Sequence, residues 1–177
     1  MWNDTYRQQA RYNQWANERV YASVEQVGEG PRKARRNIFG GSIDGVLHHL
    51  LIADGLTMAT LTNDMLGFRP RNRLGEEILL ESTVQCLYPV FEELSTARVH
   101  LDRQLVDYAE TLSESELEDL LAYFDFNGER HRALRWQLMT ELFQHQSHHR
   151  GQLSTVFYEL GQPLKNLDYS AFLRETA

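Results

Sequence analysis

Four long segments of the chain carry apolar side chains at steps of three and four residues. This spacing places the apolar side chains on one face of an α-helix and leaves the other face polar. The first two predicted helices span residues 4–27 and 42–63. The third begins near residue 89 and keeps its apolar pattern to residue 108, and the fourth spans residues 135–160. Glycine and proline stand mainly between these segments, where helices end.

Capping residues support these limits. Asn3 or Asp4 suits the N-cap of the first helix, and Ser42 suits that of the second. Pro89 fits the first turn of the third helix, where its missing N–H has no partner to lose. Gly161 follows the last apolar position of the fourth helix and predicts its end.

The connections between the helices are polar and are interpreted mainly as loops. Gly28 and Pro31 end the first helix, and the basic run 32–36 is interpreted as a solvated loop, with a phosphate-binding patch as the alternative. Residues 69–75 are rich in arginine, proline and glycine and predict a second loop. Residues 77–87 are compatible with a helical extension or with irregular structure.

A hairpin signal precedes the last helix. In residues 123–130, two strand-like runs flank Asn127-Gly128, which is a strong predictor of a β-hairpin. Residues 167–177 are expected to lie across the helices as a tail. The predicted fold class is therefore all-α, a four-helix bundle with a small β-hairpin before the last helix, in a single domain of residues 1–177.

Composition excludes several classes of protein. A length of 177 residues suits one domain with a real core. The net charge of −7 argues against nucleic acid as a partner, because phosphate binding needs a basic face, although arginines in 32–36 and 69–73 could form a patch. Cys86 is the single cysteine, which excludes an internal disulfide and a multi-cysteine metal site.

Two segments bear on the cellular location. The most apolar stretch, residues 46–56, is interrupted by His48, His49 and Asp54, so no membrane-spanning helix is expected. Residues 1–4 are polar and do not resemble a secretory signal. We therefore expect a cytoplasmic protein with no membrane partner.

Histidine is the residue type whose distribution is unusual. Five of the seven histidines lie in two clusters, His48-His49 in the second predicted helix and His145, His148 and His149 in the fourth. Histidines three or four residues apart stand on adjacent turns of one helix face, at most about 6 Å apart along the axis. Two such imidazoles can bind one metal ion.

Helical phase separates the candidates in the fourth helix. At about 100° per residue, His149 lies about 30° from the centre of the apolar stripe, His145 about 70° and His148 about 130°. The pair His145 and His149 is therefore preferred, and phase does not decide between His48 and His49 as a third ligand. Three histidines leave an open coordination position, which is typical of catalytic zinc sites.

The ordinary alternative is that the histidines hold no metal. A surface role fits His148 well and His149 poorly, because burying an unpaired imidazole is costly. Gly45, Gly55 and Gly151 lie inside predicted helices, where glycine costs about 1 kcal/mol relative to alanine. Close approach of the two histidine-bearing helices would account for all three glycines, and tolerated weak positions are the alternative.

Several motifs together resemble the DinB superfamily of DinB/YfiT-like metalloenzymes. The most specific is residues 142–152 (LFQHQSHHRGQ), with its His-x-x-x-His-Arg-Gly-Gln element. Residues 39–43 (FGGSI) leading into 47–50 (LHHL) also match, as do 12–17 (YNQWAN) and the ending 160–161 (LG). The resemblance covers nearly the whole chain.

The resemblance implies an up-down-down-up four-helix bundle and a divalent metal bound by His49, His145 and His149. It thereby selects His49 where phase does not. Asp54 and Arg150 are candidates for orienting the ligands from behind, with a surface or helix-end contact as the alternative for Arg150. Neutral imidazoles suit several metals, with zinc or nickel as first candidates and iron or manganese as alternatives.

Relatives include S-transferases and an isomerase that use low-molecular-weight thiols. The resemblance therefore implies a metal-dependent thiol S-transferase that acts on a small molecule, in a homodimer. A metal with an open position can acidify a thiol, or it can make hydroxide from water in a hydrolase-like reaction. The alternative is a non-catalytic metal-binding or stress-response protein without turnover. Cys86 lies outside both histidine segments, so the reacting sulfur would come from the cofactor or substrate.

Overall fold

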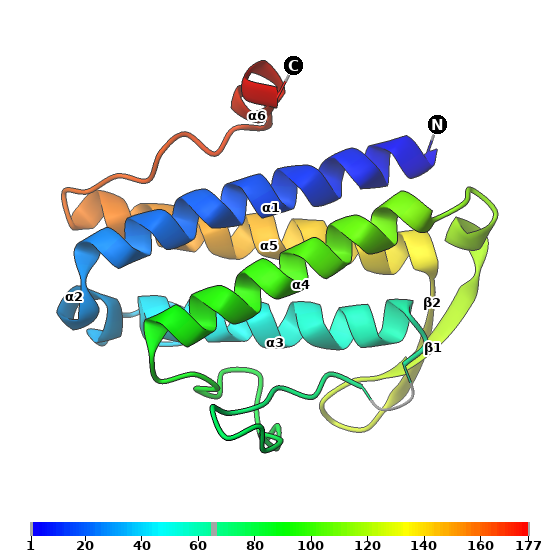
Figure 1. Ribbon diagram of the computed structural model, residues 1–177, viewed down its shortest axis with the longest axis horizontal. Coiled ribbons are helices and arrows are strands. Elements are labelled where there is room, and N and C mark those ends of the chain that lie inside the picture. Colours follow the sequence, from blue (N-terminus) through cyan, green and yellow to red (C-terminus); the bar gives the residue numbers. More distant parts are fainter. Residues whose placement is uncertain (1, 65–66, 177) are drawn as a thin grey trace.

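The computed structural model describes residues 2–64 and 67–176 and is mostly helical (Figure 1). Met1, the first residue of the polar segment 1–4, and Ala177, the last residue of the predicted tail, lie outside the described residues. The described residues form six α-helices, one 3-10 turn and one antiparallel pair of strands: α1 (Trp2–Val27), α2 (Glu29–Lys33), α3 (Ile43–Leu61), α4 (Phe91–Thr111), η1 (Glu116–Glu118), β1 (Leu120–Phe124), β2 (Arg130–Leu134), α5 (Arg135–Glu159) and α6 (Tyr169–Thr176). None of the described helices combines the length and the apolar character needed to cross a membrane.

The four long helices α1, α3, α4 and α5 lie side by side with their axes roughly aligned (Figure 1). Helix α1 packs mainly on α4, and α3 packs mainly on α5. Each predicted apolar stripe turns inward, because burial of apolar surface drives the helices together. One side chain from each helix illustrates the core, each at most 1% exposed: Val24, Ile43, Leu94 and Leu153.

Two of the four capping signals, Ser42 and Gly161, agree with the helix limits, whereas the predicted N-cap of the first helix at Asn3 or Asp4 is wrong because α1 already begins at Trp2. The Ser42 hydroxyl accepts a hydrogen bond from the backbone N–H of Gly45 (3.0 Å) and caps α3 as predicted. Gly161 has a φ of 68° just after α5, which is the left-handed conformation that ends helices. Helix α4 starts later than predicted, because Val90 is its N-cap and Pro89 therefore precedes the first turn.

The basic run after α1 is not a solvated loop throughout. Gly28, with a φ of 76°, turns the chain into the short helix α2. Arg32 at the end of α2 is buried, its Nε lies 2.9 Å from Oδ1 of Asp44, and its guanidinium stacks over the Phe91 ring. The interpretation of residue 32 as solvated is therefore wrong, because its guanidinium is buried against Asp44 of α3, a partner that the pattern within one segment does not reveal.

The C-terminal segment contains helix α6, which, like α2, the apolar pattern does not predict. The Phe172 ring is buried against Tyr12 and Trp15 of α1, at centroid distances of 5.8 and 5.7 Å. The Tyr12 hydroxyl donates to the Leu167 carbonyl (2.8 Å). These contacts tie the tail to α1.

The predicted hairpin is confirmed. Strands β1 and β2 pair antiparallel and lead directly into α5. In the turn, Asp125 accepts hydrogen bonds on its carboxylate from the backbone N–H groups of Asn127 and Glu129 (2.9 Å each). Gly128 supplies the positive φ of 77° that closes the turn.

The long connection from α3 to α4 contains no helix among its described residues. Residues 77–87 are irregular, which decides between the two alternatives for this segment. Leu87 is buried, so the segment is anchored against the core. The carbonyl oxygen of Thr83, in the same segment, accepts a hydrogen bond from His49.

The three helical glycines have different environments. The prediction that a close approach of α3 and α5 accounts for all three is therefore wrong. A Cβ on Gly45 would overlap the carbonyl oxygen of Gly40, in the turn that precedes α3. A Cβ on Gly55 would meet the Phe68 ring. A Cβ on Gly151 would meet nothing within 4 Å.

These environments predict opposite effects of the same substitution. Gly45→Ala should lower the free energy of unfolding by about 1–3 kcal/mol, because the added methyl group collides with a rigid backbone. Gly151→Ala is the matched control and should raise the free energy of unfolding by up to about 1 kcal/mol, since it only improves helix propensity. Urea unfolding of both variants measures the difference, and a Gly45→Ala protein as stable as wild type would contradict this packing.

Candidate metal centre

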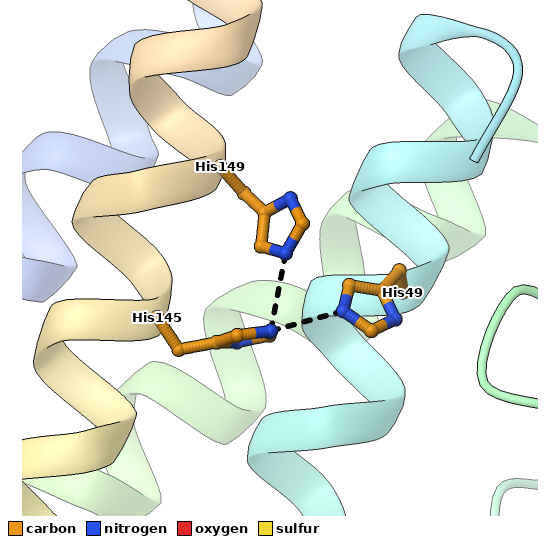
Figure 2. Close-up of side chains that lie close together, drawn as sticks. All are labelled: His49, His145 and His149. Carbon is orange, nitrogen blue, oxygen red and sulfur yellow. Dashed lines mark hydrogen bonds between the residues drawn. The ribbon is translucent and has the colours of Figure 1, made fainter. Parts of the chain in front are cut away.

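Three histidine side chains from two helices bring their Nε2 atoms together (Figure 2). His49 comes from α3, whereas His145 and His149 stand one turn apart on α5. Nε2 of His145 lies 3.0 Å from Nε2 of His49 and 3.1 Å from Nε2 of His149. The ligand atoms of all three lie within 4.8 Å of one another. These are the three residues that the family resemblance names.

Two of the rings are oriented through their other nitrogen. Nδ1 of His49 donates to the carbonyl oxygen of Thr83, and Nδ1 of His149 donates to Oε1 of Gln152, both at 2.9 Å. A neutral imidazole that donates from Nδ1 has only a lone pair on Nε2. His145 can give a proton from its Nε2 to one of these two lone pairs, so the other is left without a donor. A bound cation would satisfy all three.

The electrostatic surroundings keep the three rings uncharged. Burial lowers the pKa of each of His49, His145 and His149, and the proximity of the other histidines lowers it further. Their ordinary pKa is about 6.5, so all three are neutral at pH 7. Neutral imidazole is the form that binds a metal ion.

The cluster has the dimensions of a metal site. Bonds of about 2.0–2.1 Å at tetrahedral angles hold the nitrogen ligands of zinc about 3.3 Å apart. The Nε2 separations of 3.0 and 3.1 Å are close to this value. Hydrogen bonds from the distal nitrogen to a carbonyl or amide oxygen, as at His49 and His149, are the usual way in which proteins orient metal-binding histidines. The donor set therefore fits a divalent transition metal.

The neighbouring histidines are placed differently. His48 is 2% exposed, its Nδ1 donates to the Asp44 carbonyl (2.8 Å), and its Nε2 accepts from the Tyr88 N–H (3.2 Å). Both nitrogens are thus used within the core. His148 is exposed, as its helical phase predicts, and its ring touches that of His149.

Asp54 lies in a buried network of polar side chains and forms its hydrogen bonds there. Its Oδ2 accepts from Arg98 Nη1 of α4 (2.7 Å) and from Nε2 of Gln146 of α5. All three side chains are at most 2% exposed. Gln146 directly follows His145, so Asp54 holds α5 at the level of the histidines.

Arg150 belongs to the same network. It is 3% exposed, so a surface or helix-end position is wrong for this residue. Its Nη1 donates to Oδ1 of Asn13 (2.6 Å) and Oδ1 of Asn17 (3.2 Å) of α1, and to Oε1 of Gln146 (3.3 Å). Arg150 thereby links α5 to α1 immediately after His149.

Asp102 closes the network on α4. It pairs with Arg98 Nη2 (2.9 Å) and accepts from Nδ2 of Asn13 (3.3 Å) and of Asn17 (3.0 Å). Burial raises the pKa of Asp102 to about 6, although Arg98 opposes this rise. The network therefore connects all four long helices. Its signal in the sequence is a set of polar residues at apolar-stripe positions, among them Asn13 and Gln146.

The fold and the site define a mostly helical protein with a cluster of three histidines able to hold a divalent metal ion. The model of the DinB family matches residues 1–177, the whole chain, and the chain therefore belongs to the DinB family. No curated protein matches it.

The burial of the three rings predicts a pH dependence. In metal-free protein, His49, His145 and His149 should titrate below the ordinary value of about 6.5. Because the unfolded chain takes up these protons at a higher pH than the folded chain, their contribution to the free energy of unfolding decreases as the pH falls below about 6.5. Titration of the ring signals by NMR measures the pKa values. Values at or above 6.5 for all three rings would contradict the described site.

Proposed function

We propose that this protein binds a divalent transition metal through His49, His145 and His149 and uses it as a metal-dependent enzyme of the thiol S-transferase type. One observation carries the proposal. The Nε2 atoms of three neutral imidazoles lie together, and the single proton that His145 can give from its Nε2 satisfies only one of the two other lone pairs. Membership of the DinB family supports it. Zinc and nickel are the first candidates, followed by iron and manganese, since all accept imidazole ligands.

A metal held by three histidines supplies an open position at which a thiol is acidified and reacts as a thiolate at neutral pH. The chain contributes the positions of the rings, because Thr83 and Gln152 fix the orientation of His49 and His149.

The protein's own thiol is not suited as the nucleophile. Burial raises the pKa of Cys86, and its Sγ lies 3.8 Å from Nε2 of His48, which is outside the cluster. The reacting sulfur therefore comes from a low-molecular-weight thiol.

Asp54 and Arg150 act in this proposal as positioning residues. Both act through Gln146, whose amide donates to Asp54 and accepts from Arg150. Gln146 stands between His145 and His149 on α5 and is fully buried. Asp54 thus sets the height and rotation of α5 against α3, and Arg150 sets those of α5 against α1, so that together they support the spacing of the histidines.

The wider organisation is part of the same proposal. We propose an up-down-down-up order of α1, α3, α4 and α5, which agrees with the run of the chain in Figure 1. We also propose that residues 1–177 form one DinB-like domain, supported by the extent of the family match. A small-molecule substrate and a homodimer stay predictions of the family resemblance, and a cytoplasmic location stays a prediction from the sequence.

Metal content is the first test. Protein purified without a metal-affinity tag should contain about one divalent ion per chain by elemental analysis, as expected for three histidine ligands. His49→Ala, His145→Ala or His149→Ala should each weaken binding by more than about 100-fold, beyond the loss seen when an outer partner of a ligand is removed. Equilibrium titration of stripped protein with zinc measures the affinity.

The control for metal content is His148→Ala, which removes an exposed histidine from the same turns of α5. This variant should bind as wild type does. Metal retained at one ion per chain in the triple variant His49→Ala, His145→Ala, His149→Ala would refute the site.

Catalysis is tested separately from binding. Metal-loaded protein should accelerate the reaction of a low-molecular-weight thiol with a small electrophile, and His49→Ala should abolish both the acceleration and the metal. The rate of thiol consumption, measured with loaded, stripped and reloaded protein, checks this. A panel of thiols and electrophiles with no metal-dependent turnover, in protein that holds its metal, would favour the non-catalytic metal-binding or stress-response protein.

A further inference from the structure

An aromatic side chain lies against two of the three histidines. The ring centroid of Phe39 is 4.5 Å from that of His49 and 5.2 Å from that of His149. The residue is 44% exposed, so part of the ring contacts the imidazoles while part meets solvent. Phe39 therefore forms an apolar wall at the solvent-facing edge of the cluster.

The turn that carries this ring is hydrogen-bonded internally and packs on α3. The backbone N–H of Arg36 donates to the Gly41 carbonyl (2.8 Å), and the N–H of Gly41 donates to the Ile38 carbonyl (3.0 Å). Gly40 has a φ of 73°, and a Cβ there would lie 2.7 Å from the carbonyl carbon of Gly45. The turn is thus pressed against the first turn of α3. This packing positions the Phe39 ring beside His49 and His149.

The wall changes which ligands suit the site. A hydrated oxygen anion must give up water where it meets an aromatic ring, and the ring offers it no hydrogen bond. Sulfur is weakly hydrated and polarizable, and sulfur–aromatic contacts at about 5 Å are favourable. A ring beside two ligand histidines therefore favours sulfur over oxygen donors.

We infer that Phe39 is a specificity-determining residue, because its ring beside His49 and His149 makes a metal held there prefer a thiol sulfur to a hydrated carboxylate. The inference rests on the proposed function, since it assumes a metal held by the three histidines. It goes beyond that proposal by assigning ligand preference to a residue that binds no metal.

The test is a ligand titration of cobalt(II)-loaded protein followed by visible absorption, with 2-mercaptoethanol and acetate as probes at one pH. Phe39→Ala should lower the ratio of the acetate Kd to the thiol Kd by about tenfold, the usual discrimination of an apolar contact. Phe126→Ala is the matched control, since Phe126 lies on the hairpin turn and is 51% exposed. It should keep the wild-type ratio, and all loaded proteins should hold one cobalt per chain within error.

The outcomes separate the two proposals. Wild-type protein that binds no cobalt overturns the proposed function and this inference with it. Wild-type protein that binds cobalt, with an unchanged ratio in Phe39→Ala, overturns the inference alone. If Phe39→Ala does not load cobalt, Phe39→Gln carries the comparison, because glutamine fills similar space but removes both the aromatic face and the apolar surface. A lowered ratio in Phe39→Gln supports the inference, and an unchanged ratio overturns it.

Discussion

A pair of buried ion pairs at the centre of the helices is the constraint on which the rest of the structure depends. Arg98 of α4 lies between Asp54 of α3 and Asp102 of its own helix, at 2.7 and 2.9 Å. Removing one partner from such a group costs about 3–5 kcal/mol, because the remaining charge stays buried. A slip of α3 by one turn would separate Asp54 from Arg98, whereas the pair of Arg98 with Asp102 lies within α4 and would persist. The apolar stripes bring the helices together, and the charges select one alignment of α3 against α4.

The same constraint reaches the histidines through α5. Gln146 and Arg150 are each one residue beyond a clustered histidine, and both join the network. Asp54 is five residues beyond His49 on α3. The contact between Asp54 and Gln146 therefore sets the alignment of the two histidine-bearing helices, and the three Nε2 atoms converge as a result. A binding site built on helix interiors in this way is held more precisely than one built on loops.

Periodicity was sufficient to predict the long helices and their buried faces, because burial of apolar surface dominates that choice. It also separated His145 and His149 from the exposed His148. Periodicity within one helix says nothing about partners in another helix. Polar residues at stripe positions, such as Arg98, could be recognised as unusual, but Asp54 and Asp102 could not be assigned to them. For the same reason, the sequence did not reveal the pairing of Arg32 with Asp44.

If three imidazoles from α3 and α5 hold one metal ion, all three belong to its first coordination shell. The most direct measurement is X-ray absorption at the metal edge of the zinc-loaded protein, because it counts the imidazole ligands. We expect three imidazole nitrogens at about 2.0–2.1 Å and one further ligand. A first shell with fewer than three imidazoles, or one made mainly of oxygen atoms, would contradict this expectation.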